Sequence, residues 1–441
     1  MIDILTGAWY GDRQLPLKVP ENWDVSVFSP ATPPSLSKEQ MNIALQNSAG
    51  QEPIDKLCKG KNRPLVIVDD LNRPTPANQI MPILLKYFTN ASFSLSEITV
   101  LMATGSHGKP APDAMSKKIG PEAAGSCRLL LHDCFKKTVG LGHTSFGTRV
   151  CVNPAVLKSD FVLGIGGVYP NWTAGFGGGT KIVLGVLGLQ TIFDLHYRHS
   201  SVGWGCTKTD NSFREDLNEI SRMIGLRSSI SLQINGRREI IRVDCGDPEK
   251  YFQEAVNFCS KTFCTSLAKD ADIVISNAYP TDTSLTFART KGFTPLEYCK
   301  PTALRIGIAA CAEGIGLHNI YPFFNKPRFF RERQLFRLVR AFGMKQSSKK
   351  MLKKLRSLSS SKEKQLSEES ISRQPLLLFH TGSNLTKLPS NIPGIQQFSK
   401  WADLVHWISK EKSPSEQLKV AVYPSASLQF FKSPEFNVSP T

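Results

Sequence analysis

The chain has 441 residues, which exceeds a typical single hydrophobic core and predicts two domains. Hydrophobic residues make up 41% and charged residues 21%, and no apolar run approaches the roughly 18 residues that a membrane span needs. The formal net charge is +17, but fourteen Lys and Arg against two Glu between Lys326 and Lys364 account for +12, which leaves +5 elsewhere. The excess therefore belongs to one segment and does not favour a nucleic-acid-binding surface spread over the fold.

The first residues, MIDILTGAWYGDRQ, lack the basic start and apolar core of a secretory signal. The ten cysteines are scattered without a CxxC pair, which argues against a zinc site and suits reduced thiols. We therefore expect a cytoplasmic protein.

Strands and helices alternate along the first two hundred residues. In chain order, the expected elements are a helix at 38–47, a strand at 64–70, a helix at 78–88, strands at 97–103 and 161–165, and a helix near 181–196. Such alternation, with polar or glycine-rich segments after the strands, is typical of an α/β fold with a mostly parallel sheet.

A second unit with the same character follows. Its expected elements are strands at 272–276, 303–310 and 374–379 and a helix at 401–409. We predict an N-terminal α/β domain at 1–260 and a C-terminal α/β domain at 261–441, with the active site in the cleft between them. A basic insertion is expected at about 326–373. Its first part fits a helix packed on the second domain, or a basic amphipathic helix on a membrane surface or acidic partner.

The strand expected at 64–70 ends in two carboxylates, within the sequence Asp69-Asp-Leu-Asn-Arg-Pro-Thr-Pro76. A buried parallel strand delivers polar groups to a site at its carboxyl end. The two carboxylates and the planar guanidinium of Arg73 suit a ribose and a phosphate or carboxylate. A turn closed by an internal Asp–Arg bond is the alternative interpretation.

The next strand ends in Ala103-Thr-Gly-Ser-His107. Small residues let backbone N–H groups approach an anion, and histidine is suited to proton transfer near neutral pH. A lone histidine is often structural, but its position after a strand and a Thr-Gly-Ser turn favours a functional role.

The third motif is Gly175-Phe-Gly-Gly-Gly-Thr-Lys181, in which glycines allow close backbone contact and a lysine adds charge, as in a phosphate cradle. It is not a P-loop, because Thr180 and Ile182 stand where that motif has Gly and Ser or Thr. The glycines also lack the Rossmann spacing, so neither ATP nor NAD is supported. A flexible glycine hinge is the alternative.

Taken in order, and followed by Tyr279-Pro-x-Asp282 and Glu313-Gly-x-Gly316, these motifs resemble the lactate racemase family over roughly residues 5–320. The resemblance implies a cofactor-binding N-terminal domain. It also implies a nickel-pincer nucleotide (pyridinium-3,5-bisthiocarboxylic acid mononucleotide nickel), joined to a lysine of the glycine-rich motif, and Lys181 occupies that place.

The resemblance assigns further cofactor contacts. A histidine beyond the lysine ligates nickel, and His196 fits, although the spacing is one residue shorter than usual and leaves His199 as an alternative. Sulfur and imidazole donors suit square-planar nickel. Asp70 and Arg73 are expected to contact cofactor or substrate. Backbone groups expected to bind phosphate are those of Thr104, Gly105, Ser106, Gly177, Gly178 and Gly179.

The mechanism that the resemblance implies is reversible hydride transfer on a 2-hydroxy acid, with one histidine as base on each face of the substrate. His107 matches the first base. The second position holds Asn171, which cannot accept a proton at physiological pH. His132 or His199 is a candidate replacement; otherwise the two faces of the substrate are handled unequally.

The C-terminal half departs from the family as well. Thr286, Phe287 and Thr290 stand where the family presents a Tyr-Gln pair and a lysine to the substrate, with Lys291 one position away. We therefore expect a racemase or epimerase of a 2-hydroxy acid other than lactate, served by cofactor biosynthesis proteins. The alternatives are a cofactor-binding relative without racemase activity, or a basic protein that binds nucleic acid or a membrane surface.

Overall fold

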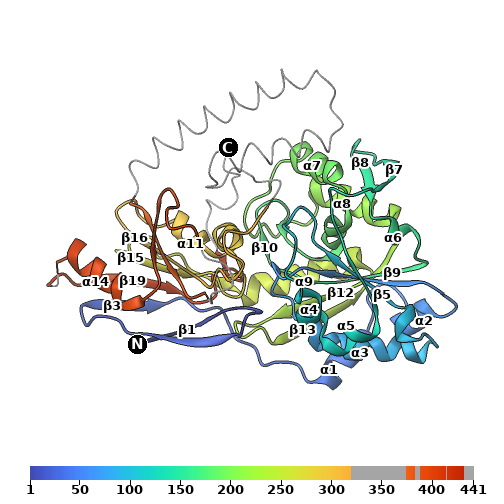
Figure 1. Cartoon of the computed structure of the whole chain (residues 1–441), viewed down its shortest axis with the longest axis horizontal. Coiled ribbons are helices and arrows are strands. Elements are labelled where there is room, and N and C mark those ends of the chain that lie inside the picture. The colour runs from blue at the N-terminus through green and yellow to red at the C-terminus, as the bar shows by residue number, and fades with distance from the viewer. Residues whose placement is uncertain (319–373, 383–387, 414, 432–441) are drawn as a thin grey trace, which may run out of the picture. The chain divides into compact units, whose positions relative to one another are not determined.

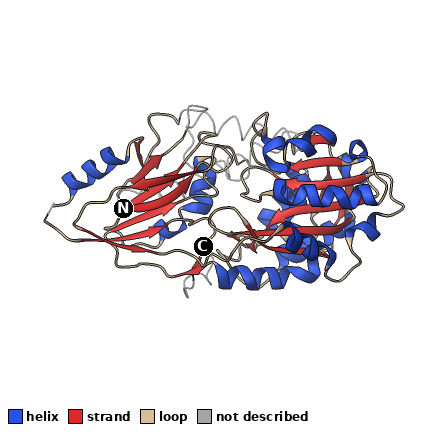
Figure 2. Ribbon diagram, turned by 90° about the horizontal axis from the view of Figure 1, so that it is seen from below, coloured by secondary structure: helices blue, strands red, loops and turns tan. Residues whose placement is uncertain are grey.

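The computed structural model describes residues 1–318, 374–382, 388–413 and 415–431. These described residues form two compact units: the first joins 1–29 to those between 267 and 427, and the second joins 30–266 to 428–431. Both units combine helices with mostly parallel sheets, as predicted, and Figure 2 shows two groups of strands with helices packed around each. The basic insertion expected at about 326–373 lies outside the described residues.

The second unit is built on a six-stranded sheet. Its strands are β4 (Pro64–Asp69), β5 (Thr99–Ala103), β6 (Arg128–Leu131), β9 (Phe161–Gly167), β12 (Leu226–Ile234) and β13 (Ile240–Gly246). Their order is β13-β12-β9-β4-β5-β6, and the described pairs are parallel apart from β12 with β13. Every residue of β4 is buried, as expected for a continuous apolar run in a sheet covered on both faces.

Helices cover this sheet (Figure 1). They are α1 (Lys38–Gln46), α2 (Ile54–Cys58), α3 (Ala77–Asn90), η1 (Leu95–Glu97), α4 (Ala114–Ile119), α5 (Pro121–Ser126), α6 (Pro154–Leu157), η2 (Gly179–Val186), α7 (Leu189–Arg198), α8 (Ser212–Met223) and α9 (Pro248–Thr262). Short strands complete the unit: β7 (Val139–His143), β8 (Arg149–Val152), β10 (Pro170–Asn171), β11 (Gly175–Phe176), β14 (Cys264–Thr265) and β20 (Phe430–Phe431).

The prediction of a single helix near 181–196 is wrong, because two helices occupy this stretch. The first, η2, is a 3-10 helix, and Gly188 adopts an extended conformation before α7 begins. The N–H of Gly188 donates to the carbonyl of Cys151 at 2.8 Å, so the backbone at the break is bonded to β8 instead of continuing the helix. Lys181 and His196 therefore lie on different helices.

The first unit has a parallel six-stranded sheet of its own, in the order β18-β17-β16-β15-β19-β3. These strands are β3 (Trp23–Val27), β15 (Ile273–Asn277), β16 (Leu304–Ala309), β17 (Leu376–His380), β18 (Ile395–Phe398) and β19 (Leu418–Tyr423). The remaining elements are β1 (Ile2–Thr6), β2 (Arg13–Leu17), α10 (Leu285–Phe287), the π-helix η3 (Ala288–Gly292), α11 (Thr294–Glu297) and α14 (Trp401–Glu411).

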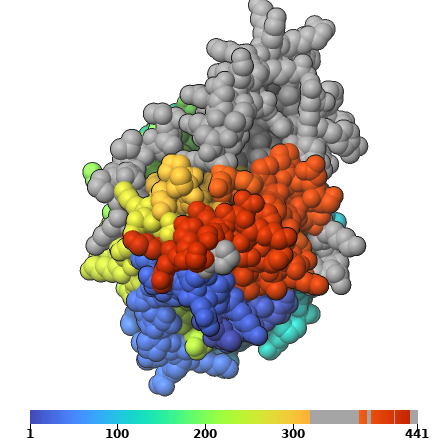
Figure 3. Space-filling view, turned by 90° about the vertical axis from the view of Figure 1, so that its left-hand side faces the viewer, coloured from blue at the N-terminus to red at the C-terminus, as the bar shows by residue number. Residues whose placement is uncertain are grey.

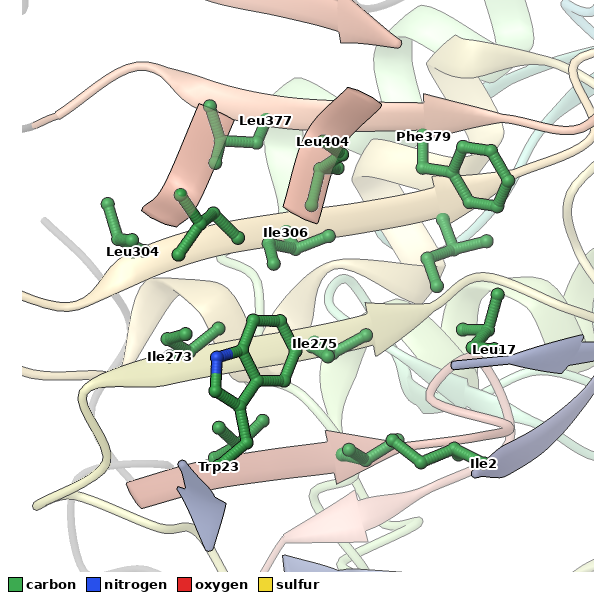
Figure 4. Close-up of a cluster of buried hydrophobic side chains, with 14 of the residues drawn as sticks. Ile2, Leu17, Trp23, Ile273, Ile275, Leu304, Ile306, Leu377, Phe379 and Leu404 are labelled. Atoms are coloured by element: carbon green, nitrogen blue, oxygen red, sulfur yellow. The ribbon is translucent and has the colours of Figure 1, made fainter. Parts of the chain in front are cut away.

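Residues 1–29 belong to this unit, whereas the predicted division at 260/261 groups them with the N-terminal domain. The reason is the parallel pairing of β3 with β19, supported by a hydrophobic cluster that includes Trp23, Ile273 and Leu418. Figure 4 shows Trp23 beside Ile273 and Ile275 in this cluster. Figure 3 shows the dark-blue N-terminal residues beside the orange and red C-terminal ones. Among the described helices, none combines the length and apolar character needed to cross a bilayer.

Candidate active site

Three of the sequence motifs follow three neighbouring strands. β9, β4 and β5 are adjacent and parallel, so their carboxyl ends share one edge of the sheet. Asp69 ends β4 and Asp70 follows it, Thr104 follows β5, and the glycine-rich segment comes after β9. The strand order thus brings to one edge the groups that the sequence assigns to one site, as is usual for ligand sites in open α/β sheets.

Asp70 and His107 form a hydrogen-bonded pair at this edge. Oδ2 of Asp70 lies 2.7 Å from Nδ1 of His107, and the two side chains are only 3% and 11% exposed. Burial opposes ionisation of Asp70, but the charge and hydrogen bond of His107, aided by Arg73 and Asn72, hold its pKa below the usual value. A carboxylate only accepts, so it fixes the hydrogen on Nδ1 and leaves the lone pair of the neutral ring on Nε2. This is the arrangement of an oriented general base.

Arg73 lies in the turn beside this pair. Its N–H donates to the carbonyl of Asp70 and its Nη1 donates to the carbonyl of Asn72, both at 3.1 Å. Its charge also contributes to the lowered pKa of Asp70. The side chain is partly exposed, so the internal Asp–Arg attraction and a role toward an anion are compatible.

The Thr104–His107 turn is held from within the protein. Thr104 Oγ1 donates to the carbonyl of His132 at 2.7 Å, and the N–H of Gly105 donates to the carbonyl of Gly185 at 3.0 Å. Gly105 has φ +53°, which favours glycine. The N–H of Gly105, expected to bind phosphate, is thus used inside the protein. Ser106 is buried in the same turn.

The glycine-rich loop needs its glycines for packing. Gly178 and Gly179 have φ of +87° and +56°, and a Cβ on them would lie 2.7 Å from Val168 and 2.8 Å from Phe252, respectively. The N–H of Gly177, also expected to bind phosphate, donates to the carbonyl of Tyr169 at 2.7 Å. These contacts give the loop a fixed shape, which differs from the flexible hinge considered from the sequence.

Lys181 and His196 meet at one aromatic ring, although they belong to different helices. Nζ of Lys181 lies 5.2 Å from the centre of the Phe213 ring, and the His196 ring packs edge-on against the same ring at 5.3 Å. Phe213 is fully buried at the start of α8, beside α7 (Figure 1). The structure therefore brings together the two residues to which the resemblance assigns cofactor attachment and metal ligation.

His196 is a neutral imidazole with a defined tautomer. Burial, followed by the charge of Lys181, lowers its pKa to about 3, against the opposing effect of the Ile192 carbonyl. Nδ1 lies 2.7 Å from that carbonyl, so it carries the hydrogen and Nε2 carries the lone pair. Ligating histidines are commonly oriented by such a bond from their other nitrogen.

His199, the alternative ligand, is placed differently. Its Nε2 lies 2.8 Å from Oδ2 of Asp216 and its Nδ1 lies 3.0 Å from Oγ of Ser212. Both ring nitrogens are thus engaged by protein groups. These contacts make His199 a poor candidate both for a metal ligand and for the second base.

Asn171 closes the turn between β10 and β11. Its Oδ1 accepts the N–H groups of Thr173 at 2.9 Å and Ala174 at 3.0 Å. The other candidate base, His132, is buried, and burial lowers its pKa to about 4. Its ring nitrogens lie 2.9 Å from the carbonyl of Leu187 and 3.1 Å from the side-chain amide of Asn153. Both residues therefore have evident structural roles.

Sequence reasoning missed three residues that shape the site: Phe213 and Arg214 on α8, and Lys118 on α4. Arg214 is buried and donates to the carbonyls of Gly178 at 2.8 Å and Phe176 at 2.7 Å, which fixes the glycine-rich loop. Lys118 is fully buried and binds Asp69 at 2.8 Å. The signal for α8 was an amphipathic stretch at 212–223 that begins after the N-cap Asn211.

In the first unit, side chains of the Tyr279–Asp282 motif form hydrogen bonds with the segment between β1 and β2. Asp282 is buried and accepts the N–H groups of Gly7 at 2.9 Å and Ala8 at 3.1 Å, while Tyr279 donates to Asp12 at 2.6 Å. Burial raises the pKa of Asp282 despite these bonds.

At the three positions where the family presents substrate contacts, the side chains of this protein contact neighbouring protein groups. Phe287 is buried with its ring 5.8 Å from that of His318. Thr286 donates to the carbonyl of Gly316 at 3.3 Å, and Thr290 donates to the carbonyl of Thr286 at 3.0 Å. These side chains lack the phenol, amide and ammonium groups of the family pattern.

The sequence of this chain is similar to those of known proteins. Residues 10–205 match the model of the lactate racemase N-terminal domain. The lactate racemase of Thermoanaerobacterium thermosaccharolyticum is 27% identical over 305 residues, which are 67% of this chain and 71% of that protein. The lactate racemase of Lactiplantibacillus plantarum is 26% identical over 293 residues, which are 64% of this chain and 68% of the relative.

Solved structures agree on the fold. The lactate racemase apoprotein from Thermoanaerobacterium thermosaccharolyticum superimposes with a TM-score of 0.68 at 18% identity, covering 98% of this chain and 100% of that one. A crystal structure from Thermotoga maritima gives a TM-score of 0.57 at 16% identity, covering 90% and 99%. The fold is therefore that of the lactate racemase apoprotein. Residues 10–205 of this chain thus match a lactate racemase N-terminal domain, and the chain is similar in sequence to two lactate racemases.

Proposed function

We propose that this protein is a racemase or epimerase of a 2-hydroxy acid other than lactate that uses a nickel-pincer nucleotide attached to Lys181. The observation that carries the proposal is the meeting of Lys181 and His196 at the Phe213 ring. A covalent anchor and a metal ligand for one cofactor must lie close together, and these two residues do so from separate helices.

The residues present fit such a cofactor. Lys181 would hold it through its amine, and Nε2 of His196 offers a neutral imidazole lone pair to nickel because Nδ1 faces the Ile192 carbonyl. When bound, the cofactor supplies the hydride acceptor and donor of the reaction. Cofactor biosynthesis proteins of the same cell would supply the group.

His107 takes the hydroxyl proton of the substrate in this proposal. Asp70 orients the ring through Nδ1, 2.7 Å away, and stabilises the imidazolium that forms. Arg73, partly exposed beside the pair, binds the substrate carboxylate or a cofactor phosphate with its planar guanidinium.

A substrate other than lactate is proposed from the first unit. The hydroxyls of Thr286 and Thr290 donate to nearby backbone carbonyls, and Phe287 is apolar and buried. A small polar hydroxy acid such as lactate gains little from this set, so a larger or less polar 2-hydroxy acid is favoured.

The first experiment produces the full chain in cells that build the cofactor. Intact-protein mass should show the cofactor on the wild type and on a Lys158→Ala control at an exposed lysine, and its loss in Lys181→Ala. The loaded protein should contain nickel and racemise one member of a panel of 2-hydroxy acids. An unmodified, nickel-free wild type from such cells would refute the proposal.

A second experiment tests hydride transfer itself. In deuterium oxide the racemised product should keep the α-hydrogen of the substrate, because a hydride moves without exchange with solvent. Incorporation of one deuterium per turnover would instead indicate proton abstraction from carbon and overturn this part of the proposal.

A cofactor-binding protein without racemase activity is the second candidate. The observation in its favour is the role of Asn171, whose side-chain oxygen caps a turn where the family has its second base. A loaded chain that oxidises one enantiomer to the 2-keto acid without forming the other would favour this candidate.

A further inference from the structure

Lys118 is a fully buried cation beneath the proposed base pair. It lies on α4, the first helix after the His107 turn, and has no exposed surface. Its Nζ lies 2.8 Å from Oδ1 of Asp69, 3.0 Å from the carbonyl of Arg73 and 3.1 Å from the carbonyl of Thr75. An ammonium has three N–H donors, and these three oxygens can accept all of them.

The contacts of Lys118 bracket Asp70. Asp69 precedes Asp70 by one residue and Arg73 follows it by three, so one ammonium binds a side-chain carboxylate on one side of Asp70 and a backbone carbonyl on the other. The two adjacent carboxylates also have separate partners, since Asp69 binds Lys118 and Asp70 binds His107. With Asp69 neutralised by its own cation, the carboxylate of Asp70 remains available to His107.

The network continues to the neighbouring strand end. Thr75 Oγ1 donates to Oδ2 of Asp69 at 2.7 Å, which leaves it to accept the hydroxyl of Tyr169 at 3.1 Å. The carbonyl of Tyr169 in turn accepts the N–H of Gly177 at 2.7 Å, in the loop that leads to Lys181. One chain of bonds therefore joins the segment after β5, the end of β4 and the glycine-rich loop after β9.

We propose that Lys118 is a positioning residue, which sets the Asp70–His107 pair in register with the glycine-rich loop through Asp69, Thr75 and Tyr169. Stability alone does not explain such a cation, because a buried ion pair is often no more stabilising than an apolar pair of the same size. The catalytic consequence rests on the proposed function, whereas the geometric consequence does not.

The experiment compares Lys118→Met, the double variant Lys118→Met/Asp69→Asn, and Lys300→Met as control. Lys300 also forms an ion pair, at 2.6 Å from Asp272, but in the first unit. The imidazole ¹⁵N signals of His107, assigned with His107→Gln, report whether Nδ1 keeps its hydrogen bond in the purified full chain. Unfolding by urea gives the stability of each variant.

We expect Lys118→Met to lose stability and the Nδ1-bonded signal of His107, and Lys300→Met to keep that signal. The double variant should regain part of the stability, because no unpaired buried carboxylate remains, without regaining the signal. On whichever 2-hydroxy acid of the panel the wild type racemises, kcat of both Lys118 variants should fall by about 10- to 100-fold with KM within about twofold, as expected for a misplaced base.

A Lys118→Met chain that folds with the wild-type His107 signal overturns the proposal, as does a double variant that regains both stability and signal. If Lys118→Met does not fold, Thr75→Val replaces it, since this near-isosteric change removes only the hydroxyl that links Asp69 to Tyr169. A wild type with neither racemase activity nor a modified Lys181 refutes the proposed function, while the His107 signal still decides the role of Lys118.

Discussion

Nδ1 of His107 lies 2.7 Å from Oδ2 of Asp70, and this bond joins residues from the ends of two adjacent strands. The parallel pairing of β4 with β5 places the two segments side by side, so the sheet itself builds the pair. The bond assigns Asp70 a role that the sequence left open between cofactor and substrate: it orients the ring that is proposed to act as base.

Asp70→Asn should therefore impair the proposed reaction without removing the base. The amide can donate to Nδ1 and favour the other tautomer, which points an N–H at the place where a lone pair is needed. We expect kcat to fall by about 100-fold or more, in line with the usual contribution of general-base catalysis. Steady-state kinetics of the loaded enzyme measure this, and a loss below about threefold would contradict the role.

The lowered pKa of Asp70 also predicts a pH dependence of stability. Between its folded pKa and the usual 3.8, the unfolded chain binds a proton that the folded chain does not. The contribution of Asp70 is therefore present above about pH 4 and is lost as pH falls through the folded pKa. Urea unfolding at pH 2.5 to 6 should show a smaller decrease for Asp70→Asn than for wild type; parallel curves would argue against a lowered pKa.

The sequence predicts those parts of the site that depend on residues close together in the chain, but not the contacts between residues far apart in it. The strand at 64–70 and the Gly175–Lys181 motif are local patterns, and the structure bears out the strand closely as β4. Lys181 and His196 both contact the ring of Phe213, which lies later in the chain on a third helix, α8. No period or spacing within 181–196 indicates that contact.

The burial of two charged side chains was also not predicted from the sequence. Lys118 reads in the sequence as one of two adjacent lysines of a short helix, and only the packing of α4 shows that it is buried while Lys117 pairs with the exposed Asp113. Arg214 likewise lies in a polar stretch, yet it is buried beneath the glycine-rich loop. Burial of a charge is decided by tertiary contacts, which local sequence patterns do not encode.

His196 should respond to the charge of Lys181. Burial and Lys181 together hold the pKa of His196 at about 3, so Lys181→Met should raise it, while burial keeps it below the usual 6.5. NMR titration of the apoprotein measures the shift. Lys158→Met is the matched control, because that lysine is exposed, and an unchanged His196 titration in Lys181→Met would mean that the two groups do not interact.

The same depressed pKa makes the folded state sensitive to acid. Between about pH 6.5 and 3 the unfolded chain protonates His196 and the folded chain does not, so its contribution to stability is lost as pH falls. His196→Gln should reduce this slope. A slope equal to that of wild type would contradict the depressed pKa.

Arg214→Lys tests the shape of the glycine-rich loop. The two Nη atoms of Arg214 serve two separate carbonyls, of Gly178 and Phe176, and one ammonium on a shorter chain does not reach both in the same way. We expect a loss of about 1.5–3 kcal/mol of unfolding free energy, the typical value of a hydrogen bond to a charged group. Cofactor occupancy of Lys181, measured by intact mass, should also fall.

The control for this change is Arg222→Lys, on the same helix, where the side chain is 60% exposed and pairs with Glu249. Exposed pairs contribute about 0–1 kcal/mol, so this variant should be close to wild type in stability and occupancy. An Arg214→Lys chain as stable and as well loaded as Arg222→Lys would show that the loop does not need the guanidinium.

Asn171 offers a direct test of the proposal that the second base is missing from this active site. Its Oδ1 accepts two backbone N–H groups, so Asn171→His should lose this cap and destabilise the protein by about 0.5–2 kcal/mol, as the loss of a cap usually does. Asn171→Asp keeps both acceptor contacts and should be close to wild type in stability.

If the chain lacks its second base, the histidine variant should also gain racemisation of the preferred substrate at temperatures where it is folded. Urea unfolding and chiral chromatography measure the two effects separately. A rate unchanged by the histidine would mean that another group serves the second face, and a histidine variant as stable as wild type would remove the turn as the reason for asparagine at this position.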